Sequence, residues 1–385
     1  MHFFLDYHKS KLPDVKTNIF TIMSQLAKEN NAINLSQGFP DFDSPKLLLE
    51  ETQKALKGNF NQYAPMAGAQ ILRVAIVKKT EVCYGVSYCP DSEVTVTAGA
   101  TQALYTAISA FVKPKDEVII IKPAYDCYEP AIKVNGGIPV DFQLEGPDYK
   151  IDWKNFADKI NSKTKMIILN SPNNPSGTIL DKQDMLALGA ILKDTPILLL
   201  CDDVYEHIIF DKQKHQSACL FADLKKRAII CSSFGKTYHI TGWKIGYCLA
   251  PKELMHEFQK VHQYNVFSVH HPSQIALAHF LNKSEDYLEL NQFYQEKRDF
   301  FLEAIKGSKF KFIPTKGTYF QLVDYASITD ENDMEFAIRL VKEKKIAAIP
   351  FSPFNTSKNA KVLRLCFAKK NDTLEKAAEI LCKIN

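Results

Sequence analysis

Hydrophobic residues in the middle of the chain gather in short runs rich in Val, Ile and Leu, with polar and helix-like segments between them. Most of these runs are almost continuously apolar, which is typical of strands buried on both faces of a parallel sheet. The runs occupy residues 93–99, 116–123, 137–142, 164–172, 196–203, 228–233 and 246–250. We therefore predict a mostly parallel sheet of seven strands.

Helical patterns lie between these runs. In residues 100–112, apolar side chains recur at spacings of three and four, which is the period of one helix face. Asp181 is placed to cap a helix over 181–194, and Pro251 stands in the first turn of a helix over 251–262. The alternation of strands and helices predicts a doubly wound α/β domain.

The pattern changes after about residue 286. Two helical segments, 286–305 and 333–344, alternate with short strand-like segments at 318–324 and 362–368. This mixture predicts a second, smaller α+β domain, against which we expect the N-terminal segment to pack. We assign the large domain to residues 43–285, and the N-terminal arm with the small domain to residues 1–42 and 286–385.

Composition narrows the class of protein. The chain has 385 residues, 46% of them hydrophobic, which suffices for two domains with a substantial core. The net charge is +4 and the lysines are scattered in ones and twos, so we expect no nucleic-acid partner. The first residues lack the pattern of a signal peptide, and no apolar run reaches the roughly 18–20 residues of a membrane span. Nine cysteines without a CxxC pair favour reduced thiols, and we expect a cytoplasmic protein without membrane association.

Polar side chains stand where the predicted strands end, at the edge where open α/β sheets bind ligands. Gly99, Ala100 and Thr101 join a strand to a helix. Free backbone N–H groups there favour a phosphate, although most such turns merely connect elements. Ser233 and Lys244 could add a hydroxyl and a positive charge to the same anion, or each could be a structural or surface residue.

A carboxylate and a lysine end two further strands. Asp202 follows a run of leucines and needs a cation or hydrogen-bond donors, as in a helix cap, a salt bridge or a contact with a protonated ring nitrogen. Lys236 follows the strand over 228–233, and a buried lysine that has lost its proton attacks carbonyl carbons. Lowering its pKa from about 10.4 to neutrality takes about three units, or roughly 4 kcal/mol. A phosphate site, a buried carboxylate and a reactive lysine together match pyridoxal 5'-phosphate (PLP).

Histidines offer little support for a metal site. His207, His239 and the pair His270 and His271 lack the flanking Cys, Asp or Glu spacing that metal centres use. We therefore expect no bound metal.

Six motifs together resemble one family. They are SSFGKTYHITGWKIGY around Lys236, INLSQGFPDFDSP near the N-terminus, NQYAPMAGAQILRVAI, NSPNNPSG, DDVYEH and LRLCFA. Taken together, and in their order along the chain, they resemble the class I/II aminotransferases, which are PLP-dependent enzymes of fold type I. The resemblance implies a large domain with a mostly parallel seven-stranded sheet flanked by helices, plus a smaller α+β domain. Within the family, the chain is most similar to bacterial methionine-preferring aminotransferases and to the kynurenine/glutamine aminotransferase branch.

The resemblance also implies roles for individual residues. It implies that Lys236, Asp202 and Tyr205 are catalytic: Lys236 bonds covalently to the cofactor and Asp202 holds the proton on its ring nitrogen. Tyr205 and Asn174 would hydrogen-bond the ring hydroxyl, and Tyr125 would stack on the ring. The phosphate would be held by Gly99, Ala100, Thr101, Ser233 and Lys244, joined by Tyr63 from a second subunit of a homodimer.

Substrate contacts follow from the same resemblance. Arg364 would bind the substrate carboxylate through two hydrogen bonds, assisted by Gly38 and Asn174. Phe20 and Phe39, with Tyr63, Phe267 and Phe351, are candidates for an apolar side-chain pocket, although core packing explains each of them singly as well.

These expectations define a reaction. The amino group of an L-amino acid, with methionine and aromatic residues favoured, would pass to a 2-oxo acid with ping-pong kinetics. The main alternative is a PLP-dependent β-lyase acting on cysteine S-conjugates. A regulatory protein would need an added DNA-binding domain, for which we see no room before residue 18 or after residue 375. A catalytically inactive binding module is disfavoured because Lys236, Asp202, Tyr205 and Arg364 are all present.

Overall fold

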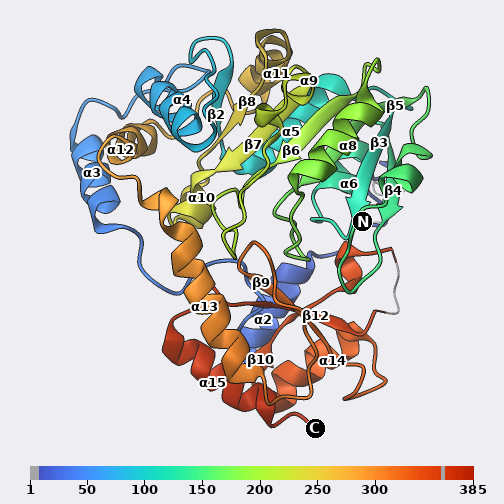
Figure 1. Ribbon diagram of the computed structural model, residues 1–385. Helices are drawn as coiled ribbons and strands as arrows, with labels where there is room; N and C mark the ends of the chain where they lie inside the picture. Colours follow the sequence, from blue (N-terminus) through green and yellow to red (C-terminus); the bar gives the residue numbers. More distant parts are fainter. Residues whose placement is uncertain (1–7, 357–359) are drawn as a thin grey trace.

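The computed structural model describes residues 8–356 and 360–385, so the first seven residues of the predicted N-terminal arm lie outside the described part. Two lobes are visible in Figure 1, a large one built on a sheet and a smaller one that contains the C-terminus. The strands of the large sheet are β2 (Val94–Thr97), β3 (Glu117–Lys122), β4 (Ile138–Gln143), β5 (Thr164–Asn170), β6 (Leu198–Asp202), β7 (Ala228–Ser233) and β8 (Gly246–Leu249). All seven fall within one residue of, or inside, the predicted runs, and the α/β fold class is confirmed.

The strand order is β2-β8-β7-β6-β5-β3-β4. The pairs from β7 to β4 are parallel, whereas β8 runs antiparallel to both β2 and β7. The carboxyl ends of β2, β5, β6 and β7 therefore meet at one edge of the sheet. The amino end of β8 arrives at the same edge.

Helices cover both faces of this sheet. On one face, α5 (Gly99–Phe111), α6 (Tyr128–Val134) and α11 (Lys252–Asn265) share a core cluster with Met166 and Ile168 of β5. On the other face, α8 (Lys182–Leu192) packs with Ile167 and Leu169. Successive residues of a strand thus enter different cores, which explains the near-continuous apolar runs.

Helix starts agree with the sequence signals. Asp181 caps α8 through its side chain, and Asp184 completes a capping box by accepting from the Asp181 backbone N–H. Pro251 immediately precedes α11. Three further helices are α3 (Lys46–Lys57), α4 (Gln70–Tyr84) and α12 (His271–Leu281). Helix α12 contacts both α3 and α4, and α4 contacts β2 (Figure 1). The remaining short elements are α7 (Trp153–Ala157), α9 (Ala222–Lys225), α10 (Phe234–Thr237) and the 3₁₀ turns η1 (Ala218–Leu220), η2 (Thr241–Trp243) and η5 (Ser352–Phe354).

The small lobe contains an antiparallel sheet in the order β11 (Ile349–Pro350), β12 (Val362–Cys366), β9 (Phe320–Asp324). Its helices are α13 (Leu290–Ile305), α14 (Asp333–Arg339) and α15 (Asn371–Cys382). The helix expected over 286–305 opens with a 3₁₀ turn, η3 (Asp286–Leu288), before α13. The helix expected over 333–344 ends as one π-helical turn, η4 (Leu340–Lys344), which stops at Lys345 in a left-handed conformation.

The N-terminal segment joins the small lobe. Strand β1 (Ile33–Asn34) pairs in parallel with β10 (Ile346–Ala347), and α2 (Ile19–Glu29) contacts β10 and β11. This pairing brings the segment that follows β1 to the boundary between the lobes.

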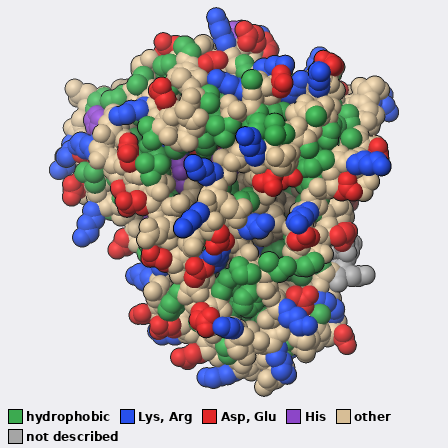
Figure 2. Space-filling view, viewed as in Figure 1, with side chains coloured by type: hydrophobic (Ala, Val, Ile, Leu, Met, Phe, Trp, Pro, Cys, Tyr) green, Lys and Arg blue, Asp and Glu red, His purple; other side chains and the backbone are tan. Residues whose placement is uncertain are grey.

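The surface is mixed in charge. On the face seen in Figure 2, lysine and arginine side chains are interspersed with acidic ones, without a continuous basic stripe. Over residues 8–356 and 360–385, the helices are too short or too polar to cross a membrane.

Candidate active site

A cavity of about 160 Å³ lies where β5, β6 and β7 end and α5 begins. Ten of the eleven residues predicted to hold the cofactor line it, and only Tyr63 lies elsewhere. The ten are Gly99, Ala100, Thr101, Tyr125, Asn174, Asp202, Tyr205, Ser233, Lys236 and Lys244. Residues that are far apart in the sequence therefore line the same cavity, because neighbouring strands of the sheet end at this edge.

Lys236 occupies α10, a single turn that follows β7 directly. The Ser233 hydroxyl caps this turn by accepting from the Gly235 backbone N–H at 3.1 Å. The Lys236 Nζ donates to the carbonyl oxygen of Gly38 at 2.8 Å. Burial lowers the pKa of Lys236 to about 8, and the nearby Arg364 and Lys244 cations act in the same direction. A neutral amine is thus accessible near physiological pH.

Asp202 ends β6 and is 3% exposed. Tyr128 donates its hydroxyl proton to the Oδ2 of Asp202 at 2.6 Å, and the Asn170 side-chain amide donates to the Asp202 carbonyl at 2.9 Å. Burial raises the pKa of Asp202 to about 6, although the bond from Tyr128 opposes the shift. Tyr128 and Asn170 were not predicted as site residues. Tyr128 begins a helix, and no local pattern shows that its hydroxyl reaches across to β6.

The raised pKa of Asp202 predicts a stability effect. The folded pKa of about 6 exceeds the unfolded value of 3.8, so ionisation of Asp202 opposes folding. This penalty is absent below about pH 4, grows as the pH rises and is complete above about pH 6, where it amounts to about 3 kcal/mol. We expect Asp202→Asn to raise the melting temperature of the cofactor-free protein at pH 7.5, and to raise it less at pH 5. Thermal unfolding at both pH values measures this.

Asp203→Asn is the matched control for that experiment. Asp203 accepts from His215 and from Ser217, both at 3.0 Å, so its replacement weakens two buried contacts and should lower the melting temperature. A lower melting temperature for Asp202→Asn than for the wild type at pH 7.5 would contradict the prediction.

The N-terminus of α5 and Lys244 form an anion-binding corner. Gly99 has φ +76°, and a Cβ built there would lie 3.4 Å from the Lys244 Nζ, so the ammonium stands beside the free N–H groups of the helix. At Gly246, a Cβ would lie 2.6 Å from the Ser232 carbonyl oxygen and 2.9 Å from the Ala100 nitrogen. Glycine at this position lets β8 pass close to the helix start.

Arg364 is the buried cation of the site. It lies on β12 with 1% exposure, and its Nη1 donates to the Asn174 Oδ1 at 2.6 Å. Its Nη2 donates to the Ser36 carbonyl oxygen at 3.0 Å. Its guanidinium stacks 3.7 Å from the centre of the Phe320 ring, with Phe20 at 5.2 Å. Burial lowers the pKa of Arg364 to about 10, which leaves it charged at neutral pH.

Gly38 joins the N-terminal segment to both lobes. Its carbonyl oxygen accepts from the Lys236 Nζ and from the Tyr319 hydroxyl at 2.5 Å. A Cβ at Gly38 would lie 2.7 Å from the Phe320 Cζ, so this close approach requires glycine.

Tyr205 and Tyr125 complete the walls of the cavity. The Lys236 Nζ lies 5.8 Å from the centre of the Tyr205 ring, and burial raises the pKa of the Tyr205 phenol. Tyr125 forms a hydrogen bond with Thr101 and contacts Tyr128 edge-on. Asn174 is oriented by its backbone N–H, which donates to the Asn170 Oδ1 at 2.8 Å.

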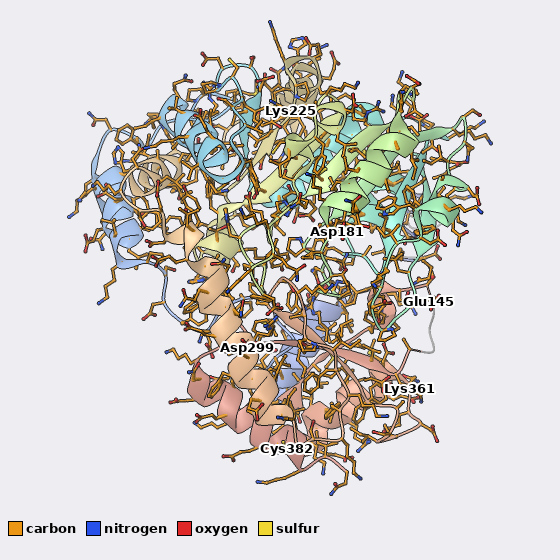
Figure 3. All side chains as sticks on the ribbon, in the orientation of Figure 1. Glu145, Asp181, Lys225, Asp299, Lys361 and Cys382 are labelled. Carbon is orange, nitrogen blue, oxygen red and sulfur yellow. The ribbon has the colours of Figure 1, made fainter. Side chains whose placement is uncertain are left out.

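The aromatic residues that were candidates for the side-chain pocket lie in different parts of the structure. Phe20 lies next to Arg364, whereas Phe39 is 46% exposed beside Lys369. Phe351 is 1% exposed and lines a larger cavity of about 970 Å³ between the lobes, apart from Lys236. Figure 3 shows Glu145 and Asp181, which also line that larger cavity, at the lower margin of the large lobe, and Lys361 on the small lobe. Phe351 therefore lies away from the Lys236 cavity.

Tyr63 projects away from the chain. It is 82% exposed and contacts the half-exposed Phe267 edge-on at 5.6 Å. Within the described residues, Tyr63 is thus outside the cavity of its own chain.

Comparison with known proteins agrees with this geometry. The family described as aminotransferase class I and II matches residues 30–381. A methionine aminotransferase of Escherichia coli is 49% identical over 375 residues, covering 97% of each chain. A crystal structure of an Escherichia coli protein with an identified methionine aminotransferase function is 48% identical and superimposes with a TM-score of 0.95 over 98% of this chain and 99% of that one. A probable N-succinyldiaminopimelate aminotransferase of Mycobacterium tuberculosis is 34% identical over 96% of each chain. Kynurenine–oxoglutarate transaminase 1 of the mouse is 31% identical over 97% of this chain and 96% of that one.

The chain therefore belongs to the class I and II aminotransferases, and it is an amino-acid aminotransferase. The predicted family, its fold type I architecture and its dependence on PLP are confirmed.

The side chains present fit that cofactor. The buried carboxyl of Asp202 suits a protonated ring nitrogen, the Lys236 amine suits an aldehyde, and the corner of α5 with Lys244 suits a phosphate. Among residues 8–356 and 360–385, no cluster of three His, Cys, Asp or Glu side chains is arranged to hold a metal ion.

Proposed function

We propose that the cavity around Lys236 is the PLP site and that this aminotransferase prefers methionine and aromatic amino acids as donors. The observation that carries the site assignment is a half-buried lysine, whose pKa is lowered to about 8, in the same cavity as a buried carboxyl. An aminotransferase needs both groups, one to exchange with the substrate amine and one to keep the ring protonated.

Each wall of the cavity then has a task. Asp202, oriented by Tyr128, would hold the ring nitrogen, and Tyr125 would lie against the ring. Tyr205 and Asn174 would hold the ring hydroxyl. The phosphate would be held by Gly99, Ala100, Thr101, Ser233 and Lys244.

The chain moves a proton at one atom. When bound, the cofactor supplies an aldehyde that takes up the amino group and a protonated ring that withdraws electrons from the α-carbon. The Nζ of Lys236, neutral in an appreciable fraction at pH 7–8, accepts the α-proton and returns it. Because the same residues serve the donor amino acid and then the 2-oxo acid acceptor, the kinetics are ping-pong.

Arg364 orients the substrate. Its guanidinium binds the α-carboxylate, assisted by the Asn174 side chain and by the segment that carries Gly38. Phe20 lies over the guanidinium and extends the contact surface toward the substrate side chain, with Phe39 at the exposed rim.

The donor preference has two supports. The relative from Escherichia coli, at 49% identity, is named a methionine aminotransferase. The ring centre of the half-buried Phe20 lies 5.2 Å from the Arg364 guanidinium carbon, so an aromatic surface stands beside the proposed carboxylate-binding group, and such a surface suits thioether and aromatic side chains.

A donor panel tests this function. We expect methionine and aromatic amino acids, offered with several 2-oxo acids, to give the highest kcat/KM among twenty amino acids. Best activity with aspartate or glutamate would contradict the preference, and no amino transfer to any acceptor would contradict the function. Pyruvate released from a cysteine S-conjugate without an acceptor, faster than any amino transfer, would favour the β-lyase alternative.

We further propose a homodimer in which Tyr63 reaches the phosphate of the neighbouring subunit. The support is its 82% exposure next to the exposed Phe267, an aromatic pair that a partner surface would cover. Light scattering that gave the 43.7-kDa mass of one chain at micromolar concentration would contradict the dimer.

A cytoplasmic location completes the proposal. All nine cysteines are free in the structure, which suits a reducing compartment. Detection of the protein in a secreted fraction would contradict it.

A further inference from the structure

A buried ion pair lies beneath the proposed cofactor cavity, with no role in the reaction derived above. The Lys79 Nζ of α4 contacts the Glu206 Oε1 at 2.8 Å, and both residues are less than a tenth exposed. Burial alone would raise the pKa of Glu206, yet Lys79 and several hydrogen bonds hold it well below its usual range. Glu206 is therefore ionised inside the fold, where an unpaired charge would be strongly destabilising.

Three hydroxyl groups also donate to this carboxylate. Ser232 and Tyr247 donate to the Oε1 at 2.7 and 2.9 Å, and Tyr84 donates to the Oε2 at 2.5 Å. The Tyr247 hydroxyl in addition accepts from Lys79 at 2.9 Å. One carboxylate thus holds residues from α4, β7 and β8 together.

Glu206 and two of the residues that it bonds are each the sequence neighbour of a residue at the proposed cofactor site. Glu206 follows Tyr205, Ser232 precedes Ser233, and Tyr247 follows Gly246. Ser232 and Tyr247 are register partners, as are Ser233 and Gly246 on the next rung. Successive residues of a strand point to opposite faces of the sheet. The hydrogen bonds from Ser232 and Tyr247 to Glu206 on one face therefore fix the positions of Ser233 and Gly246, which face the other side.

We propose that Glu206, charged and held by Lys79, is a positioning residue for the cofactor site. Its hydrogen bonds to Ser232 and Tyr247 fix the neighbouring residues Ser233 and Gly246. Ser233 caps α10 and Gly246 lies against the start of α5, so Glu206 determines the positions of both elements relative to Lys236. The inference rests on the proposed assignment of this cavity to PLP.

Three single variants form a matched test. Ser232→Ala, Tyr247→Phe and Tyr84→Phe each remove one hydroxyl from the same carboxylate. Ser232 adjoins Ser233, which lines the cavity, and Tyr247 adjoins Gly246, which lies against the start of α5 at Ala100. Tyr84 instead ends α4, and its sequence neighbours lie outside the cavity. A purely structural network would make all three behave alike.

The readout is the dissociation constant of PLP from the purified full-length protein, measured by absorbance titration of the cofactor-free form. We expect Ser232→Ala and Tyr247→Phe to raise it at least fivefold and to shift the pH midpoint of the bound cofactor's absorbance. Tyr84→Phe should change it less than twofold, despite a comparable fall in melting temperature. Equal dissociation constants for the three variants would overturn the inference.

A double variant removes the charge altogether. Lys79→Met with Glu206→Leu replaces the pair by apolar side chains of similar volume, a change that often leaves stability intact. Because Ser232, Tyr247 and Tyr84 lose their shared acceptor here, we expect a lower melting temperature together with a dissociation constant raised at least tenfold. A wild-type dissociation constant would overturn the inference, whatever the melting temperature. If the wild-type protein itself took up no PLP, the proposed function and this inference would both be wrong, whereas uptake by the wild type with equal values for all variants would reject only the positioning role.

Discussion

Replacing Lys236 by alanine should lower the turnover of every amino donor by at least about 10³-fold, since a positioned acid–base group alone contributes about 10²–10⁴. The residue has two tasks, a covalent bond to the cofactor and proton transfer at the α-carbon. Within the described part of the chain, the other lysine that lines the cavity is Lys244, which stands beside the N-terminus of α5 at the proposed phosphate corner and is not placed to take over. Steady-state assays with methionine measure the effect, and residual activity above a few per cent would reject the assignment.

The control and a direct chemical test accompany this variant. Lys225→Ala removes a lysine at the top of the large lobe, whose Nζ lies over the Tyr88 ring and outside the cavity, and it should keep full turnover (Figure 3). Borohydride reduction of the wild-type holoenzyme, followed by peptide mapping, should place a pyridoxyl group on Lys236. An adduct on Lys244 instead would exchange the roles of the two lysines.

Replacing Arg364 by lysine should lower kcat/KM for amino acids by about 10²–10³, the effect of losing a charge-assisted pair of hydrogen bonds worth about 3–4 kcal/mol. Lysine keeps the charge but cannot present two parallel N–H groups to a carboxylate, nor stack on Phe320 as the planar guanidinium does. Cofactor affinity should change less than threefold. Comparable losses of cofactor affinity and kcat/KM would contradict the assignment.

Arg298→Lys is the matched control for this change. Arg298 is also buried, at 4% exposure, and forms a pair of hydrogen bonds with Asp211 at 2.7 and 2.8 Å. Its other hydrogen bonds go to Asp299 and Thr315, outside the Lys236 cavity, whereas Arg364 bonds Asn174, which lines that cavity. Its replacement should lower the melting temperature and leave kcat/KM near the wild-type value. The contrast separates loss of substrate binding from loss of stability.

The strands of the large domain could be predicted because they carry their own signal. A strand buried on both faces must be apolar at nearly every position, so Val94–Thr97 or Leu198–Asp202 is visible in the sequence without knowledge of its neighbours. The cap at Asp181 is equally local, since the residue bonds the next turn of its own helix. The ends of these strands then located most of the cavity, because parallel strands bring their carboxyl ends together.

Long-range contacts left no such signal. The hydroxyl of Tyr128 reaches Asp202, 74 positions away, and Lys79 meets Glu206 across 127 positions. A lysine in a helix and a glutamate in the turn after β6 look like solvated surface residues until the packing of α4 against the sheet is known. Roles of individual residues at the cavity came from the resemblance of whole motifs, which carry information that periodicity lacks.

The crowded contact at Gly38 has a consequence for protein engineering. No side chain can be added at that position without displacing Phe320, so libraries that vary it would mostly yield inactive proteins. Phe20 is in contrast open to substitution, because it lies in the first turn of α2 and is only half-buried. Its ring nevertheless lies next to Arg364. Efforts to retune the donor range of this scaffold should therefore mutate Phe20 first and leave the glycine unchanged.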